Sequence, residues 1–81
     1  MVDKIDAITE KIIGSAYLVS NTLGSGFLEK VYQNALFHEI LTTDLIVFKQ
    51  YPVNVWYKGA LVGEYFADLM VEENVVVEIK A

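Results

Sequence analysis

The sequence predicts an α+β domain in which two N-terminal helices are followed by a three-stranded antiparallel meander. In its first half, apolar residues recur at three- and four-residue steps, the spacing that gives a helix one apolar face. After residue 44 the chain changes to β-branched and aromatic residues separated by short polar turns, which is typical of strands. At 81 residues the chain is expected to form a single domain.

The first helix is expected over residues 3–20. Residues 21–26 contain two glycines and two hydroxyl side chains, so they predict a break between helices. The second helix is expected over about residues 27–42. The expected apolar face of the first helix consists of Ile5, Ile8, Ile12, Ala16, Val19 and Leu23, and that of the second of Leu28, Val31, Tyr32, Ala35, Leu36 and Ile40.

The three strands are expected over residues 47–57, 61–71 and 75–80. Pro52 cannot donate a backbone hydrogen bond, so the first strand is expected either to lie at an edge of the sheet or to contain a bulge. Trp56 and Tyr57 are interpreted as packing residues of that strand. Lys58, Gly59 and Ala60 predict the first turn.

The apolar pattern fixes the register of the last two strands. Burying alternate residues of both strands on one face places Val71 opposite Val75 and leaves a three-residue loop, in which Asn74 suits a left-handed backbone. The same register sets Asp68 directly opposite Glu78, with Lys80 on the same side as Glu78.

Two carboxylates in opposite positions destabilise a sheet unless something neutralises them. Three solutions remain open for Asp68 and Glu78: an ion pair with Lys80, a shared proton, or a divalent cation. Carboxylate oxygens suit Mg²⁺ or Mn²⁺. With Gly26 as N-cap, Glu29 falls at the N3 position of the second helix, where the helix dipole favours a carboxylate for structural reasons.

Composition limits the classes of function. The chain has 11 acidic residues against 6 Lys and Arg, a net charge of −5, which argues against a large passive phosphate-binding surface. It has no cysteine, which excludes disulfides and Cys-based zinc sites. No apolar run is long enough to span a membrane, and we expect a cytoplasmic protein.

The segment from Leu23 to Leu36 resembles the signature of the GxxExxY proteins, here Gly26, Glu29 and Tyr32. The similarity continues through Gln50 and through residues 56–59, 66–69 and 77–81. That family is placed in the PD-(D/E)XK nuclease-like superfamily, with a restriction-endonuclease-like core. The resemblance implies that Asp68, Glu78 and Lys80 match the catalytic Asp, Glu and Lys, and that Glu29 matches an acidic residue of the first core helix.

The resemblance further implies a metal-dependent nuclease that hydrolyses phosphodiester bonds in DNA, with Asp68, Glu78 and Glu29 as ligands of Mg²⁺ or Mn²⁺. Ala67 stands where the superfamily motif has its proline. Because family members continue into a second helix and a fourth strand, we expect a C-terminally truncated, inactive chain. Its third strand would then be an exposed edge through which it forms homo-oligomers. The alternatives are a non-catalytic binding or assembly module that retains the fold, and a structural oligomer with an ion-pair cluster.

Overall fold

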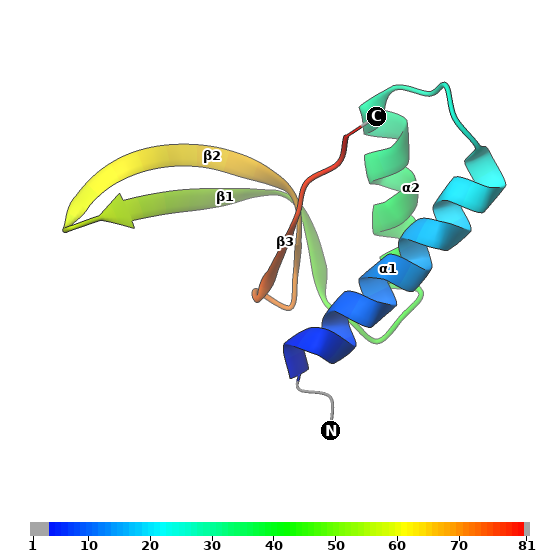
Figure 1. Ribbon diagram of the computed structural model, residues 1–81, viewed down its shortest axis with the longest axis horizontal. Coiled ribbons are helices and arrows are strands. Elements are labelled where there is room, and N and C mark those ends of the chain that lie inside the picture. Colours follow the sequence, from blue (N-terminus) through cyan, green and yellow to red (C-terminus); the bar gives the residue numbers. More distant parts are fainter. Residues whose placement is uncertain (1–3, 81) are drawn as a thin grey trace.

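The predicted class and order of elements are confirmed. A computed structural model describes residues 4–80. Figure 1 shows two helices followed by a three-stranded antiparallel sheet. The elements are α1 (Lys4–Leu23), α2 (Glu29–Leu41), β1 (Val47–Tyr57), β2 (Ala60–Val71) and β3 (Val75–Val77). Among the described residues, no helix has the length and apolar composition needed to cross a membrane.

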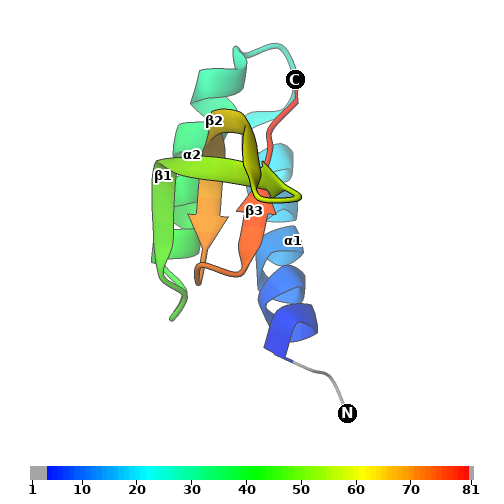
Figure 2. The same ribbon diagram turned by 90° about the vertical axis from the view of Figure 1, so that its left-hand side faces the viewer.

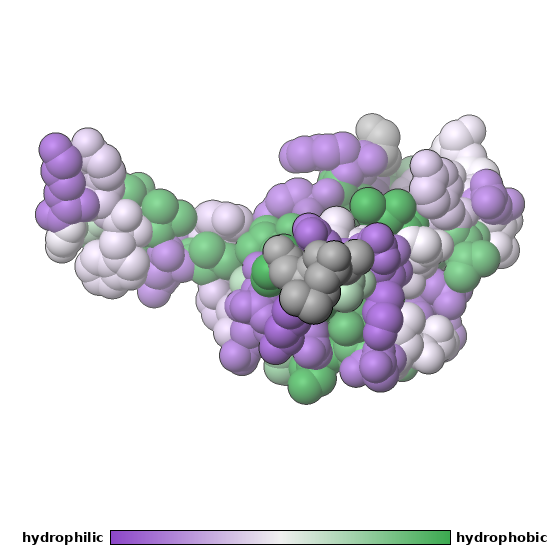
Figure 3. All heavy atoms as spheres, turned by 60° about the horizontal axis from the view of Figure 1, so that its bottom comes forward, coloured by the Kyte–Doolittle hydropathy of each residue, from purple (hydrophilic) through white to green (hydrophobic). Residues whose placement is uncertain are grey.

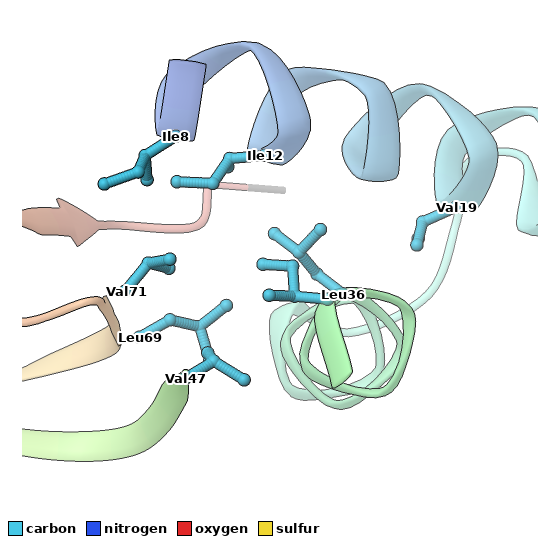
Figure 4. Close-up of a cluster of buried hydrophobic side chains, with 8 residues drawn as sticks. Ile8, Ile12, Val19, Leu36, Val47, Leu69 and Val71 are labelled. Carbon is cyan, nitrogen blue, oxygen red and sulfur yellow. The ribbon is translucent and has the colours of Figure 1, made fainter. Parts of the chain in front are cut away.

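The sheet has the order β1-β2-β3, and both helices pack against the same face of it. Figure 2 shows β3 running beside α1. Pro52 lies in an edge strand, as predicted. The core between the layers, most of which Figure 4 labels, consists of Ile8, Ile12, Val19, Leu36, Ile40, Val47, Leu69 and Val71.

The helices bury a narrower face than the sequence suggests. Ile8, Ile12 and Val19 are buried as predicted, but Ile5 and Ala16 are exposed because α1 meets the sheet along a single line of residues. In α2, Leu36 and Ile40 are buried, whereas Leu28 and Val31 are exposed. The helix begins at Glu29 with Leu28 as its N-cap, so the predicted Gly26 cap was wrong and Glu29 is the first helical residue.

The ends of β1 and β2 extend beyond the helices as a two-stranded ribbon, residues 53–66, which we call the hairpin arm (Figures 1 and 3). At its tip, Lys58 (φ 48°) and Gly59 (φ 82°) form a two-residue turn. Trp56 and Tyr57 are 63% and 61% exposed, so their interpretation as packing residues was wrong. Neither helix packs over this part of the sheet.

The register of β2 and β3 is the predicted one. Val71 pairs with Val75, Met70 with Val76 and Leu69 with Val77. The loop between them is also three residues long, but its left-handed residues are Glu72 (φ 55°) and Glu73 (φ 56°), so the assignment of that conformation to Asn74 was wrong. The Glu72 carboxylate accepts a hydrogen bond from the Ile46 N–H at 2.6 Å, and the Glu72 N–H donates to the Ile46 carbonyl at 2.8 Å. These two contacts stabilise a glutamate in a conformation that it otherwise disfavours.

Candidate functional site

Asp68 occupies the face of the sheet that points away from the helices. Its neighbours Ala67 and Leu69 are completely buried on the helix side, and successive strand residues point to opposite faces. The Asp68 side chain is half-buried, and its Oδ2 accepts a hydrogen bond from the Ile79 N–H at 2.8 Å. This bond fixes the carboxylate against the chain that continues from β3.

Glu78 is one residue beyond the last pair of the β2–β3 ladder. A regular ladder would place it opposite Asp68, because the preceding pair is Leu69 with Val77. The ladder ends at Val77 instead, so β3 is shorter than the predicted strand over 75–80. The strand ends there because the Ile79 N–H donates its hydrogen bond to the Asp68 side chain and not to a backbone carbonyl of β2. Glu78 is exposed.

Lys80 is exposed and makes no ion pair with either carboxylate. Over residues 4–80 the only ion pair within 4.0 Å joins Lys11 to Asp44, at 2.6 Å. The structure therefore gives no support to an ion-pair cluster of Asp68, Glu78 and Lys80 in this chain. The like charges of Asp68 and Glu78 are not neutralised by the described residues around them.

Glu29 does not join a group of three metal-binding side chains within the described residues. It is exposed at the first turn of α2, on the helix side of the sheet, whereas Asp68 lies on the opposite face. Among the described residues, no three His, Asp or Glu side chains lie close enough together to hold a metal ion. The three predicted ligands are therefore not assembled into one cluster.

An apolar groove of about 740 Å³ lies between α1, the loop over 24–27 and the residues over 77–80. Tyr32 stabilises the loop at one side of it: the Tyr32 hydroxyl donates to the Gly24 carbonyl at 2.7 Å and accepts from the Phe27 N–H at 3.3 Å. Tyr32 also packs against the core, as predicted, so it has both an apolar and a polar role. The groove brings the loop of the predicted signature beside Glu78 and Lys80.

Two glutamines that contact each other, Gln33 and Gln50, were not predicted as site residues. Gln33 is only 4% exposed, and its Oε1 accepts a hydrogen bond from Gln50 Nε2 at 3.1 Å. Gln50 lies in β1 with φ 51°. The sequence offered one signal for Gln33: it lies four residues after Glu29, on the same side of the helix. The backbone of Gln50 had no signal, because glutamine is not typical of left-handed positions.

A family profile described as the PD-(D/E)XK nuclease superfamily matches residues 6–81. This match covers nearly the whole chain. The chain belongs to the PD-(D/E)XK nuclease superfamily. No curated protein and no solved structure matches it significantly.

Members of the PD-(D/E)XK nuclease superfamily typically depend on a metal ion. The donors of this chain suit such an ion in kind: Asp68 and Glu78 provide carboxylate oxygens, and Mg²⁺ is usually held by one or two carboxylates together with water and phosphate oxygens. Asp68 Oδ2 is held by the Ile79 N–H, while Oδ1 has no hydrogen bond from the described residues. A hydrogen bond that orients a ligating carboxylate in this way is a common feature of metal sites.

Proposed function

We propose that this chain is a metal-dependent nuclease domain of the GxxExxY type that hydrolyses phosphodiester bonds in DNA. One observation carries the proposal. Asp68 is fixed by the Ile79 N–H beside the segment that continues from β3, and this segment also contains Glu78 and Lys80. An Asp on β2 is thus joined to the Glu-x-Lys segment that directly follows β3, in a member of a nuclease superfamily.

Asp68 and Glu78 would hold Mg²⁺ or Mn²⁺, with Glu29 contributing through water from the helix side. When bound, such an ion lowers the pKa of a bound water and stabilises charge on phosphate oxygens. The hydrogen bond from the Ile79 N–H would hold the Asp68 carboxylate in place for the ion. Lys80 would orient the attacking water and offset part of the phosphate charge.

The acidic composition is compatible with this role. At a net charge of −5 the chain as a whole repels a polyanion. A divalent cation held by two carboxylates reverses the sign of the potential locally, so the metal-loaded site would be the place where a phosphate can approach. Binding of DNA should therefore depend on the metal ion and weaken as the salt concentration rises.

A Mn²⁺ titration by calorimetry tests the proposal, with the parent chain and the variants Asp68→Asn and Glu64→Gln. Glu64 is an exposed carboxylate of the same strand, so its substitution removes the same charge away from the site. We expect one stoichiometric site in the parent and in Glu64→Gln, and none in Asp68→Asn. Equal binding by Asp68→Asn and the parent, or no binding by the parent, would contradict the metal site.

The alternative is a non-catalytic binding or assembly module with a nuclease-like fold. The observation that favours it is that residues 4–80 contain no group of three His, Asp or Glu side chains placed to hold a metal ion. A parent chain that binds no Mn²⁺ would support this alternative. A cytoplasmic location remains a prediction under either function.

We also propose that the chain forms homo-oligomers through β3. This strand lies at an edge of the sheet, and Val76 is 42% exposed on it. Exposed apolar edges associate with other strands unless a charge blocks them. Light scattering should show a dimer or larger species that Val76→Lys converts to monomer, and a monomeric parent at high concentration would contradict the proposal.

A further inference from the structure

Gln33 and Gln50 are joined by a hydrogen bond, and each of the two residues has a feature that destabilises the fold. The Gln33 side chain is 4% exposed, and its Nε2 has no hydrogen-bond partner within the described part of the chain. Exchanging the amide nitrogen and oxygen of both side chains would only transfer the deficit to Gln33 Oε1. A buried polar atom without a partner destabilises a protein, so its presence requires an explanation.

Gln50 adds a second cost at the same place. Its φ of 51° lies in the left-handed region, which glutamine rarely adopts. The other non-glycine residues with positive φ, namely Lys58, Glu72 and Glu73, lie in turns. Gln50 instead lies inside β1, a strand that bends between its covered end and the hairpin arm (Figures 1 and 2), so its left-handed backbone belongs to a strand and not to a turn.

The left-handed residue is located opposite Asp68. β1 pairs Lys49 with Leu69 and Tyr51 with Ala67, but the pair between them, Gln50 with Asp68, is missing from the ladder. Lys49 already faces the helices, with its Nζ 4.8 Å from the centre of the Phe37 ring. Gln50 also reaches a residue of α2. Two successive side chains of a regular strand point to opposite faces, so the left-handed backbone has turned Gln50 away from the face of Asp68.

We propose that Gln33 and Gln50 are positioning residues that keep the face beside Asp68 clear of a cross-strand side chain. A regular residue at position 50 would lie about 4.5–5.5 Å from Asp68 between Cβ atoms. Turning it toward α2 leaves room for a divalent cation and a phosphate at this carboxylate. Gln33 holds the turned side chain, which is why a buried amide is retained in α2. The inference rests on the proposed metal-dependent function.

Substitutions at position 50 separate this role from ordinary packing. Valine strongly disfavours positive φ, so Gln50→Val should return β1 to a regular strand and place an apolar side chain beside Asp68. Glycine accepts the left-handed backbone and adds no side chain, so Gln50→Gly should keep the face clear. We expect the dissociation constant for Mn²⁺ to rise about tenfold or more in Gln50→Val. It should match the parent in Gln50→Gly.

Gln33→Met provides a second test that does not depend on the folding of Gln50→Val. Methionine has a similar volume and removes the unpartnered amide, so this variant should melt no lower than the parent. Because Gln50 loses the residue that holds it, Mn²⁺ binding should nevertheless weaken. Asn34→Met, at the exposed neighbouring position, is the matched control and should bind like the parent.

The outcomes distinguish the inference from the function on which it rests. A parent chain without a Mn²⁺ site overturns both. If the parent binds and Gln50→Val or Gln33→Met binds equally well, the positioning role is wrong while the proposed function stands. If affinity simply follows melting temperature across the four variants, the pair has only a structural role. Weak binding in a variant that melts no lower than the parent supports the inference.

Discussion

The two halves of the β1–β2 hairpin have similar amino-acid compositions but different environments. In the half under the helices, Ala67, Leu69 and Val71 are completely buried. In the hairpin arm, Trp56 and Phe66 are 63% and 64% exposed. Both halves are rich in β-branched and aromatic residues, so their composition does not separate them. What differs is that α1 and α2 pack over one half only (Figure 1).

This difference means that stability and exposed apolar surface are concentrated in separate parts of one hairpin. A two-stranded ribbon without a packed face is marginal in water. The arm should therefore open much more often than the covered half, and amide hydrogen exchange should detect this difference. The following substitutions break or sharpen the contrast, beginning with the largest expected effect.

Leu69→Ala should have the largest effect. Leu69 is completely buried in the core that joins both helices to the sheet, and such a truncation usually costs about 2–5 kcal/mol. This is a large fraction of the stability of a small domain, so the free energy of unfolding measured in urea should fall steeply. A loss below about 0.5 kcal/mol, the usual range for surface substitutions, would show that the covered half is not the stable one.

The sequence predicted the buried half of the hairpin but not the exposed arm. The burial of Leu69 and Val71 and the pairing of Val71 with Val75 followed from alternation, because a one-residue slip would expose the whole apolar set. The exposure of Trp56 did not follow, since alternation within a strand cannot say whether another layer lies above it. Whether a strand face is buried depends on where the helices pack, which the sequence of the strand itself does not encode.

The candidate site divides in the same way. Asp68 and the segment of Glu78 were placed beside each other by strand register, which the local pattern encodes. Gln33 and Gln50 were missed because their contact joins a helix to a strand 17 residues away and needs a left-handed backbone that glutamine does not predict. Such departures from local preference are expected where function, not stability, determines the residue.

Gly59→Val should have an intermediate effect confined to the arm. Gly59 has φ 82°, and a side chain in the left-handed region costs about 1–2 kcal/mol. We expect faster amide exchange over residues 53–66 and unchanged exchange around Leu69. The covered half of the same hairpin serves as the internal reference for amide exchange in the arm. Faster exchange in both halves would show that the hairpin opens as one unit.

Trp56→Ser should change stability little, despite the size of the side chain removed. Trp56 is largely exposed, and surface substitutions usually stay within about 0.5 kcal/mol. The midpoint of urea unfolding, followed by circular dichroism, should match that of the parent. A marked loss of stability would mean that the arm is covered in solution by another copy of the chain, and the effect would then depend on protein concentration.

The smallest effect is expected at the surface ion pair that joins α1 to the segment leading into β1. The Lys11 ammonium donates a hydrogen bond to Asp44 Oδ1 at 2.6 Å and holds the pKa of that carboxyl below its ordinary value of 3.8. A carboxyl with a lowered pKa contributes stability above its unfolded pKa, and this contribution is lost as the pH falls through the folded pKa. Both side chains are exposed, so the effect should be small and screened by salt.

Asp44→Asn should therefore melt slightly below the parent at neutral pH and low salt, with the difference vanishing below the folded pKa. A difference that persists in acid would show that Asp44 acts through its shape and not its charge, and the contact would then belong to the packing of the covered half.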